Sequence, residues 1–270
     1  MNENYFYLEL LADPVTKKPT TESAFPKING IIDARIFLKN TYGYKEWFDG
    51  QISYEKLASN SRKETQAEVE KYRIEIEYDR PIYEHFKMNG TILDVGGGCG
   101  TVREFLSTQV QFISIDPYIN CLYEVRKSRQ EAYTCFSHPL NFVAATAEFL
   151  PFVSESFDWI HMRSMIDHVQ IPDLALMEAR RVLNPDGKLL LGLYVEGGKF
   201  CIFNTKQRIK KLLKKLFCLF GIDRWKDHHI WHPTYNGLIK LLEDNGFKIE
   251  DVYWQPHFVD QVCYICASKA

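Results

Sequence analysis

A short apolar run, ILDV (92–95), leads directly into a glycine-rich loop, GGGCG (96–100). Four of the five loop positions are glycine, which adopts positive φ without steric cost and leaves the space above its backbone open. The loop therefore predicts a backbone that approaches a ligand closely, and a helix after it would point free N–H groups at that ligand. The glycines are Gly96, Gly97, Gly98 and Gly100.

Apolar runs alternate with helical patterns from position 91 onward, with TVREFLST and LALMEARRVL among the expected helices. Continuous apolar strands that alternate with helices are typical of a parallel sheet covered on both faces. The last two expected strands are separated by a short turn around Pro256 and suit an antiparallel hairpin. We therefore predict an α/β, Rossmann-like, doubly wound fold with seven mostly parallel strands and an antiparallel C-terminal strand. The expected strands lie in ILDV (92–95), FISI (112–115), NFVAAT (141–146), FDWIHM (157–162), KLLLGLYV (188–195), FKIEDVYWQ and FVDQVCYICAS.

The spacing of the glycines in the loop distinguishes between two classes of cofactor. A dinucleotide-binding loop needs a third glycine where this chain has Thr101, which disfavours a nicotinamide dehydrogenase. Asp94 and the glycines instead form D-x-G-x-G-x-G, which matches motif I of the class I S-adenosylmethionine (SAM)-dependent methyltransferases.

Three further segments resemble that family in the correct order. Asp116 ends the second strand, where an acid can bind both ribose hydroxyls; alternatively, it is a helix N-cap before Tyr118. ATAEFLPF (145–152) resembles the segment that surrounds the adenine, although Thr146 replaces its usual acid. EARRVLNPDGKLLL resembles the turn before the fifth strand, where we expect Glu178 and Arg181 to be structural. The resemblance implies SAM as cofactor, bound by Asp94, Gly96, Gly97, Gly98, Gly100, Asp116, Pro117, Thr146, Ala147, Glu148, Met162 and Arg163.

The resemblance also implies methyl transfer to a small-molecule, glycan-linked or lipid-linked acceptor, with a hydroxyl as the favoured target. His168, which we expect to open the helix after the fourth strand, and His229 are the candidates for the base that takes the acceptor's proton. For His168, a packed structural histidine is the alternative. His229 stands five residues before Thr234, which is expected to cap the next helix, as in related sugar- and lipid-modifying methyltransferases. A SAM-binding, non-catalytic partner subunit is the alternative function.

DNA is not an expected substrate. The chain has 33 basic and 35 acidic residues, whereas nucleic-acid-binding domains are usually basic. The residues after the fourth strand also lack the N-P-P-Y type motif of enzymes that methylate adenine.

No metal site is expected from the sequence. The segment from Asp227 to His232 carries three histidines, but Pro233 makes a regular chelating helix doubtful. The first 45 residues resemble a zinc-ribbon-like module in which Asp13 and Thr16 replace the cysteine ligands, so zinc is not expected there. Cys263 and Cys266 lie three apart in an expected strand and should face opposite sides of the sheet as buried thiols.

The domain prediction comprises a degenerate ribbon-like module (1–45), a helical cap (46–90) and the SAM-binding domain (91–270). We expect Pro81 to break or kink the long helix of the cap. The SAM-binding domain carries a lid insertion at 197–232. Its amphipathic stretch 206–220 is expected to pack over the site, or alternatively to touch an anionic membrane surface. The predicted location is cytoplasmic, with peripheral contact at the inner membrane as the alternative; the oligomeric state is left open.

Overall fold

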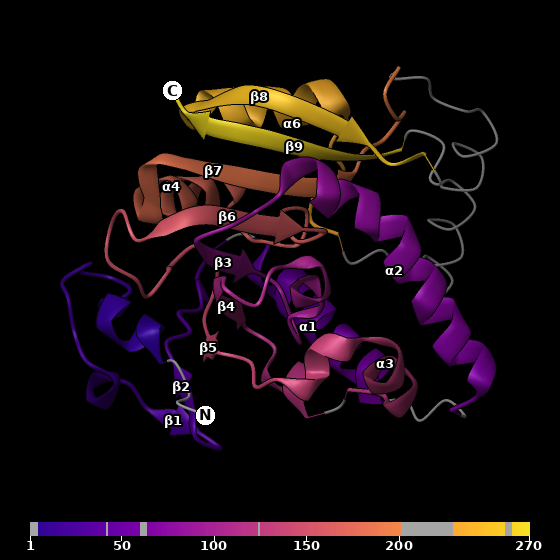
Figure 1. Cartoon of the computed structure of the whole chain (residues 1–270). Helices are drawn as coiled ribbons and strands as arrows, with labels where there is room; N and C mark the ends of the chain where they lie inside the picture. The colour runs from indigo at the N-terminus through magenta and orange to yellow at the C-terminus, as the bar shows by residue number, and fades with distance from the viewer. Residues whose placement is uncertain (1–4, 42, 60–63, 124, 201–228, 257–260) are drawn as a thin grey trace, which may run out of the picture.

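The computed structural model describes residues 5–41, 43–59, 64–123, 125–200, 229–256 and 261–270 (Figure 1). These residues form one mixed sheet with strand order β1-β2-β5-β4-β3-β6-β7-β9-β8. The strands are β1 (Lys27–Ile28), β2 (Ile31–Asp33), β3 (Thr91–Val95), β4 (Gln111–Asp116), β5 (Phe142–Ala144), β6 (Phe157–Arg163), β7 (Leu183–Tyr194), β8 (Phe247–Trp254) and β9 (Val262–Lys269).

The centre of the sheet is parallel, and its C-terminal end is antiparallel. Strands β2, β5, β4, β3, β6 and β7 pair in parallel, whereas β9 runs antiparallel to β7 and β8 antiparallel to β9. This arrangement confirms the predicted α/β sheet with an antiparallel end.

The predicted number of seven strands is wrong, because the N-terminal segment adds a hairpin to the edge of the sheet. Ile28 pairs with Ile31 across a two-residue turn, and Ile32 of β2 pairs with Val143 of β5. Asn29 and Gly30 form the turn with φ of 50° and 83°, and such Asn-Gly turns are a strong hairpin signal. The first 45 residues therefore contribute strands to the same sheet.

Helices cover both faces of the sheet (Figure 1). Ile92 of β3 belongs to the same buried cluster as Ile82 of α2. Its neighbour Leu93 belongs to the cluster that contains Leu176 of α4 and Leu238 of α6. The described α-helices are α1 (Tyr44–Ser59), α2 (Gln66–Phe86), α3 (Lys127–Ala132), α4 (Pro172–Val182) and α6 (Tyr235–Asp244); the 3-10 helices are η1 (Phe6–Leu10), η2 (Glu22–Ala24), η3 (Thr101–Phe105), η4 (Ile119–Leu122) and η5 (Thr134–Ser137).

Side chains along β9 alternate between the two faces of the sheet, and this places the two thiols of the C-x-x-C sequence on opposite faces. Cys263 is buried in the cluster with α4 and α6, and Cys266 is buried in the cluster with α2. The prediction that these thiols face opposite sides of the sheet is confirmed.

Two expected helices differ from the prediction. Helix α2 continues through Pro81, so of the predicted break or kink the break is wrong, and the kink stays a prediction. The next residues, Ile82 and Tyr83, are buried against the sheet, and this burial offsets the lost hydrogen bond. The helix after the glycine loop is a five-residue 3-10 helix, η3, which is shorter than TVREFLST indicated.

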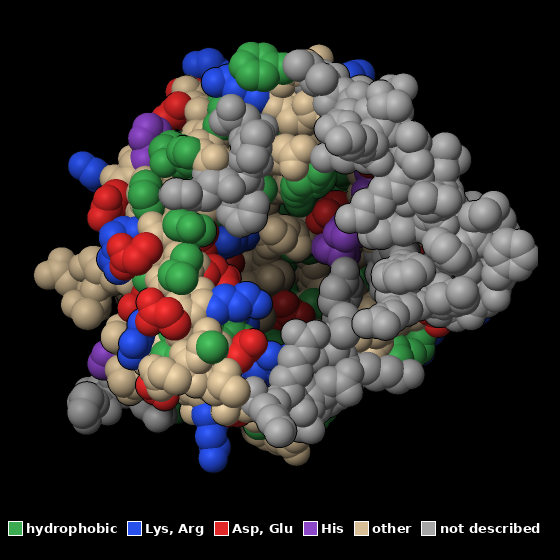
Figure 2. Space-filling model, turned by 90° about the vertical axis from the view of Figure 1, so that its right-hand side faces the viewer, with side chains coloured by type: hydrophobic (Ala, Val, Ile, Leu, Met, Phe, Trp, Pro, Cys, Tyr) green, Lys and Arg blue, Asp and Glu red, His purple; other side chains and the backbone are tan. Residues whose placement is uncertain are grey.

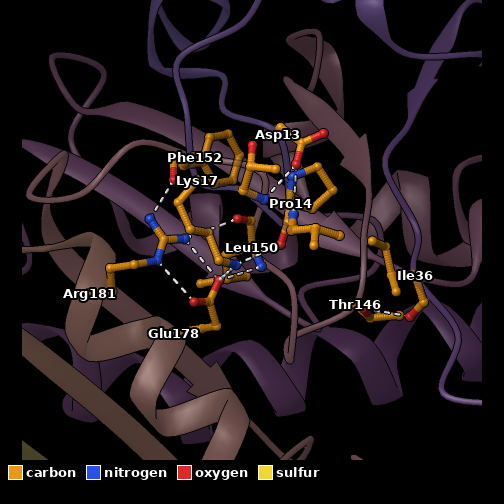
Figure 3. Close-up of polar contacts among 11 residues, drawn as sticks. Asp13, Pro14, Lys17, Ile36, Thr146, Leu150, Phe152, Glu178 and Arg181 are labelled. Atoms are coloured by element: carbon orange, nitrogen blue, oxygen red, sulfur yellow. Dashed lines mark hydrogen bonds and ion pairs between the residues drawn. The ribbon is translucent and has the colours of Figure 1, made fainter.

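Charged side chains fasten the N-terminal segment to α4 and to the segment before β6 (Figure 3). Lys17 Nζ lies 2.5 Å from Glu178 Oε2, which also accepts the Leu150 N–H. Arg181 donates to the carbonyl of Phe152 at 2.7 Å. Glu178 and Arg181 therefore hold the backbone around 150, as expected of structural residues.

Asp13 organises the turn in which a zinc-ribbon would carry its first ligand. Its Oδ1 accepts the N–H groups of Val15 and Thr16, and these bonds lower the pKa of the Asp13 carboxyl. The carboxylate thus closes this turn with two hydrogen bonds.

Candidate functional site

The candidate site is a cleft at the edge where the parallel strands end. Figure 2 looks onto this side of the molecule and shows acidic and histidine side chains around a recess near its centre. The cleft is open on one side, and the space between its walls, including open solvent, amounts to about 800 Å³. It is lined by Trp47, Gln51, Gly96, Ile115, Asp116, Pro117, Tyr118, Ala145, Thr146, Ala147, Glu148, Ser164, Met165, His168 and Val169.

The glycine loop leaves β3 with three left-handed residues. Gly96, Gly98 and Gly100 have φ of 69°, 53° and 69°, conformations that side chains with a Cβ rarely adopt. A Cβ on Gly96 would lie 2.8 Å from the Cβ of Met165, so this position admits only glycine. A Cβ on Gly98 would meet nothing closer than Asp116 Oδ2 at 4.0 Å, which shows open space beside the loop.

Asp116 closes one side of that open space from the end of β4. Its Oδ2 accepts the Gly98 N–H at 3.1 Å, and its Oδ1 accepts the Tyr118 N–H at 2.8 Å. Burial raises the pKa of the Asp116 carboxyl to about 6. Since an ionised carboxylate offers about four acceptor positions, two remain for the hydroxyl groups of a ribose. Asp116 therefore caps the turn and can also bind a ligand.

Two of the residues expected at the adenine are held by other parts of the chain. The Thr146 hydroxyl donates to the carbonyl of Ile36 at 3.1 Å (Figure 3). Glu148 Oε1 accepts the N–H groups of Gln170 at 2.8 Å and of Ile171 at 3.4 Å. Burial raises the pKa of the Glu148 carboxyl. Both side chains line the cleft and also fix the segments that border it.

Several predicted cofactor residues do not line the cleft. Asp94 accepts from His161 Nδ1 at 2.7 Å, on the side of the sheet that α2 covers. A Cβ on Gly97 would collide with the Asp94 carboxylate, so this side chain supports the loop from behind. Arg163 instead pairs with Asp79 of α2 at 2.5 and 2.9 Å. Of the predicted residues, the lining includes Gly96, Asp116, Pro117, Thr146, Ala147 and Glu148, but not Asp94, Gly97, Gly98, Gly100, Met162 or Arg163.

The two predicted histidines lie together, and His168 lines the cleft. His168 belongs to the turn between β6 and α4; since α4 begins at Pro172, His168 does not open that helix as expected. The rings of His168 and His229 have centroids 4.4 Å apart and planes inclined by 35°. Downstream of His229, the hydroxyl of Thr234 accepts the Gly237 N–H, so the predicted cap of this helix is confirmed.

Asp167 joins this pair and was not predicted. Its Oδ1 lies 3.8 Å from His168 Nε2, and its Oδ2 lies 3.6 Å from His229 Nε2. The carbonyl of Asp167 accepts the Ile230 N–H at 2.9 Å, which ties the two segments together. An acid directly before His168 in MIDHV was the signal that sequence reasoning did not use.

Helix α1 supplies two residues that no sequence pattern indicated. Trp47 and Gln51 line the cleft from the helical cap, and the Trp47 ring packs near Phe37 and Tyr44. The cap therefore forms one wall of the site.

Part of the predicted lid lies outside the described residues. This applies to the amphipathic stretch 206–220 and to Asp227 and His228. Among the helices that the structure describes, none is long and apolar enough to cross a membrane.

The central part of the chain is similar to a known family of domains. Residues 93–191 match the family model described as a methyltransferase domain. The matched residues run from β3 through most of β7 and include the glycine loop, Asp116 and the segment with Asp167 and His168.

Curated relatives match part of the chain. Demethylmenaquinone methyltransferase of Renibacterium salmoninarum is 30% identical over 101 residues, 37% of this chain and 39% of that protein. Ubiquinone/menaquinone biosynthesis C-methyltransferase UbiE of Bartonella tribocorum is 34% identical over 113 residues, 41% of this chain and 42% of that protein. The chain therefore spans about two fifths of the length of these two relatives.

A solved structure agrees with the fold. The PH0226 protein of Pyrococcus horikoshii superposes with a TM-score of 0.54 at 18% identity, over 74% of this chain and 91% of that one. The α/β fold predicted from the sequence is thereby confirmed.

Proposed function

We propose that this protein, whose residues 93–191 form a class I SAM-dependent methyltransferase domain, methylates a small molecule that carries an ionisable hydroxyl group. SAM is the methyl donor of this family. The methyl-transfer activity of the whole chain and the identity of its acceptor are our proposal.

The observation that carries the proposal is the pairing of Asp116 with the glycine loop. The left-handed Gly98 donates its N–H to Asp116 Oδ2 and leaves open space at that point. Asp116 keeps acceptor positions for ribose hydroxyls, while Ala147 and Pro117 offer apolar surface along the same cleft. Together, these acceptor positions and this apolar surface fit a nucleoside cofactor that carries no phosphate.

The acceptor would enter beside His168, which lines the cleft together with Gly96. When bound, SAM supplies an electrophilic methyl group on a positively charged sulfur. The chain's own contribution is to hold the acceptor in line with that methyl group and to exclude water. The group of Asp167, His168 and His229 would take up the proton that the acceptor loses during the transfer.

The names of the relatives refine the acceptor class. Both relatives are named as methyltransferases in menaquinone chemistry, and one name specifies transfer to carbon. Loss of a proton from a ring hydroxyl makes both its oxygen and the adjacent ring carbons nucleophilic. A phenol or quinol acceptor therefore fits the imidazoles of the cleft and the relatives alike.

Binding and turnover test the proposal in that order. Thermal-shift measurements with SAM, S-adenosylhomocysteine and NAD should show stabilisation by the first two compounds only. Incubation with SAM labelled in its methyl group and a panel of phenols and quinols should then transfer label to a product, and NMR would locate the methyl group. Stabilisation by NAD alone would refute the proposal. Cofactor binding without turnover would favour the non-catalytic partner subunit.

A further inference from the structure

We propose that Asp167, His168 and His229 form a binding site for one divalent first-row transition-metal ion. One ligand atom from each of the three residues lies within 4.8 Å of the other two. Two histidines and one carboxylate, with further positions open, form a recurrent metal-binding set, and imidazole suits zinc and iron.

The positions of the three side chains suit the binding of one metal ion. Both Nε2 atoms point at the same carboxylate, at 3.6 Å from His229 and 3.8 Å from His168. These distances exceed those of hydrogen bonds, and ligand atoms about 2.1 Å from one ion lie roughly 3.0–3.4 Å apart in octahedral or tetrahedral geometry. The three ligand atoms, all within 4.8 Å of one another, would therefore draw closer together on binding one ion.

The carboxylate provides an independent observation. Asp167 is only 7% exposed, and its Oδ1 is buried without a hydrogen-bond partner in the described structure. A buried carboxylate oxygen without a partner is costly, and native proteins rarely leave one in this state. A cation at this position would satisfy it.

The surrounding backbone holds the ligands from two separate parts of the chain. Glu148 binds the N–H groups of Gln170 and Ile171 and so fixes the turn that carries Asp167. The bond from the Ile230 N–H to the Asp167 carbonyl positions the residue after His229. The sequence did not predict this site because its ligands become neighbours only when the segments before α4 and before α6 meet.

The metal would act on the acceptor, and this role rests on the proposed function. His168 belongs to the cleft that we assign to SAM, so an ion on this residue would face the acceptor. With the ion bound, the three side chains coordinate it and do not take up the proton themselves. The cation lowers the pKa of a coordinated hydroxyl, whose proton is released to water. The acceptor oxyanion, or the ring carbon beside it, would then attack the methyl group.

Cobalt binding tests the site without any turnover. The full chain, free of any affinity tag, is titrated with Co²⁺ and followed by its visible absorption and by calorimetry. We expect one Co²⁺ per chain and displacement by Zn²⁺. Asp167→Asn and His229→Ala should each weaken binding at least about tenfold, a size that even the loss of an outer-sphere partner reaches.

His138→Ala is the matched control, because His138 is exposed in the segment before β5 and is not part of the cluster. It should bind Co²⁺ like the unmodified chain. Calorimetry with S-adenosylhomocysteine checks that each variant is folded. Co²⁺ binding that is equal in the unmodified chain and in both site variants would overturn the metal site.

A separate measurement distinguishes this result from failure of the proposed function. If Co²⁺ binds as expected but no SAM binding is found, the metal site is supported and the proposed methyl transfer is refuted. If SAM binds and methyl transfer proceeds at full rate in a chelator that removes Co²⁺, the metal role is refuted and the proposed function stands.

Discussion

The affinity for SAM should fall as the pH is lowered from 7 to 5, and Asp116 should be the cause. Burial raises the pKa of its carboxyl to about 6, and only the ionised form accepts hydrogen bonds from both ribose hydroxyls. The ionised fraction is about 0.9 at pH 7 and about 0.09 at pH 5 for a pKa of 6. SAM binding should therefore weaken about tenfold, or about 1.4 kcal/mol.

Calorimetric titration with S-adenosylhomocysteine at both pH values measures this change, and circular dichroism checks the fold. Asp116→Asn is the matched variant, because its amide has the shape of the carboxylate but does not titrate. At pH 7 it should bind about 1.5–3 kcal/mol more weakly, the contribution of hydrogen bonds to a charged group. Its affinity should change much less than tenfold between pH 7 and pH 5. An equal tenfold change in both proteins would refute the reasoning and would point to Glu148.

The same variant should stabilise the cofactor-free protein at pH 7. A raised pKa in the folded state means that Asp116 destabilises the fold when it is ionised. This destabilisation is absent below the unfolded pKa of about 3.8 and is complete above pH 6. We expect Asp116→Asn to gain about 1 kcal/mol in urea unfolding at pH 7, since the amide also loses one N–H partner. A variant that is less stable than the original at pH 7 would contradict this sign.

Three other substitutions have separate outcomes. Gly98→Val should abolish SAM binding because it fills the open side of the loop, whereas Gly30→Val, at a similar positive φ in the remote β1–β2 turn, should retain it. His229→Ala should lower turnover roughly a hundredfold with the SAM dissociation constant unchanged; normal turnover would remove it from the mechanism. Asp79→Asn leaves Arg163 without its buried partner, so urea unfolding should show a loss of about 3 kcal/mol at unchanged SAM affinity.

Local patterns predicted the parts of the fold that depend on neighbouring residues. The apolar runs located β3, β4 and β6 closely, because each of these strands is buried on both faces. The predicted number of strands was too low because the hairpin around Asn29 and Gly30 was missed. Its recognisable turn joins strands of only two and three residues. Runs this short carry too little periodicity to be seen without their partner strand.

The sequence predicted those parts of the site in which a single segment carries both the recognisable motif and the residues that face the cleft. Gly96 and Asp116 follow directly from the strand ends. The sequence could not show that Asp94 and Arg163 face α2, since their partners His161 and Asp79 stand far from them in the chain. Trp47 shows the same limit, because only the packing of α1 brings it to the cleft.

The cofactor side and the acceptor side of the cleft are mechanically linked through Glu148. This residue stands in the segment expected around the adenine, yet its carboxylate holds the backbone of Gln170 and Ile171. The turn fixed in this way carries both Met165, which packs against Gly96, and Asp167, which faces the histidines. A change at Glu148 should therefore alter the positions of cofactor and acceptor together, whereas a change at His229 should affect the acceptor alone.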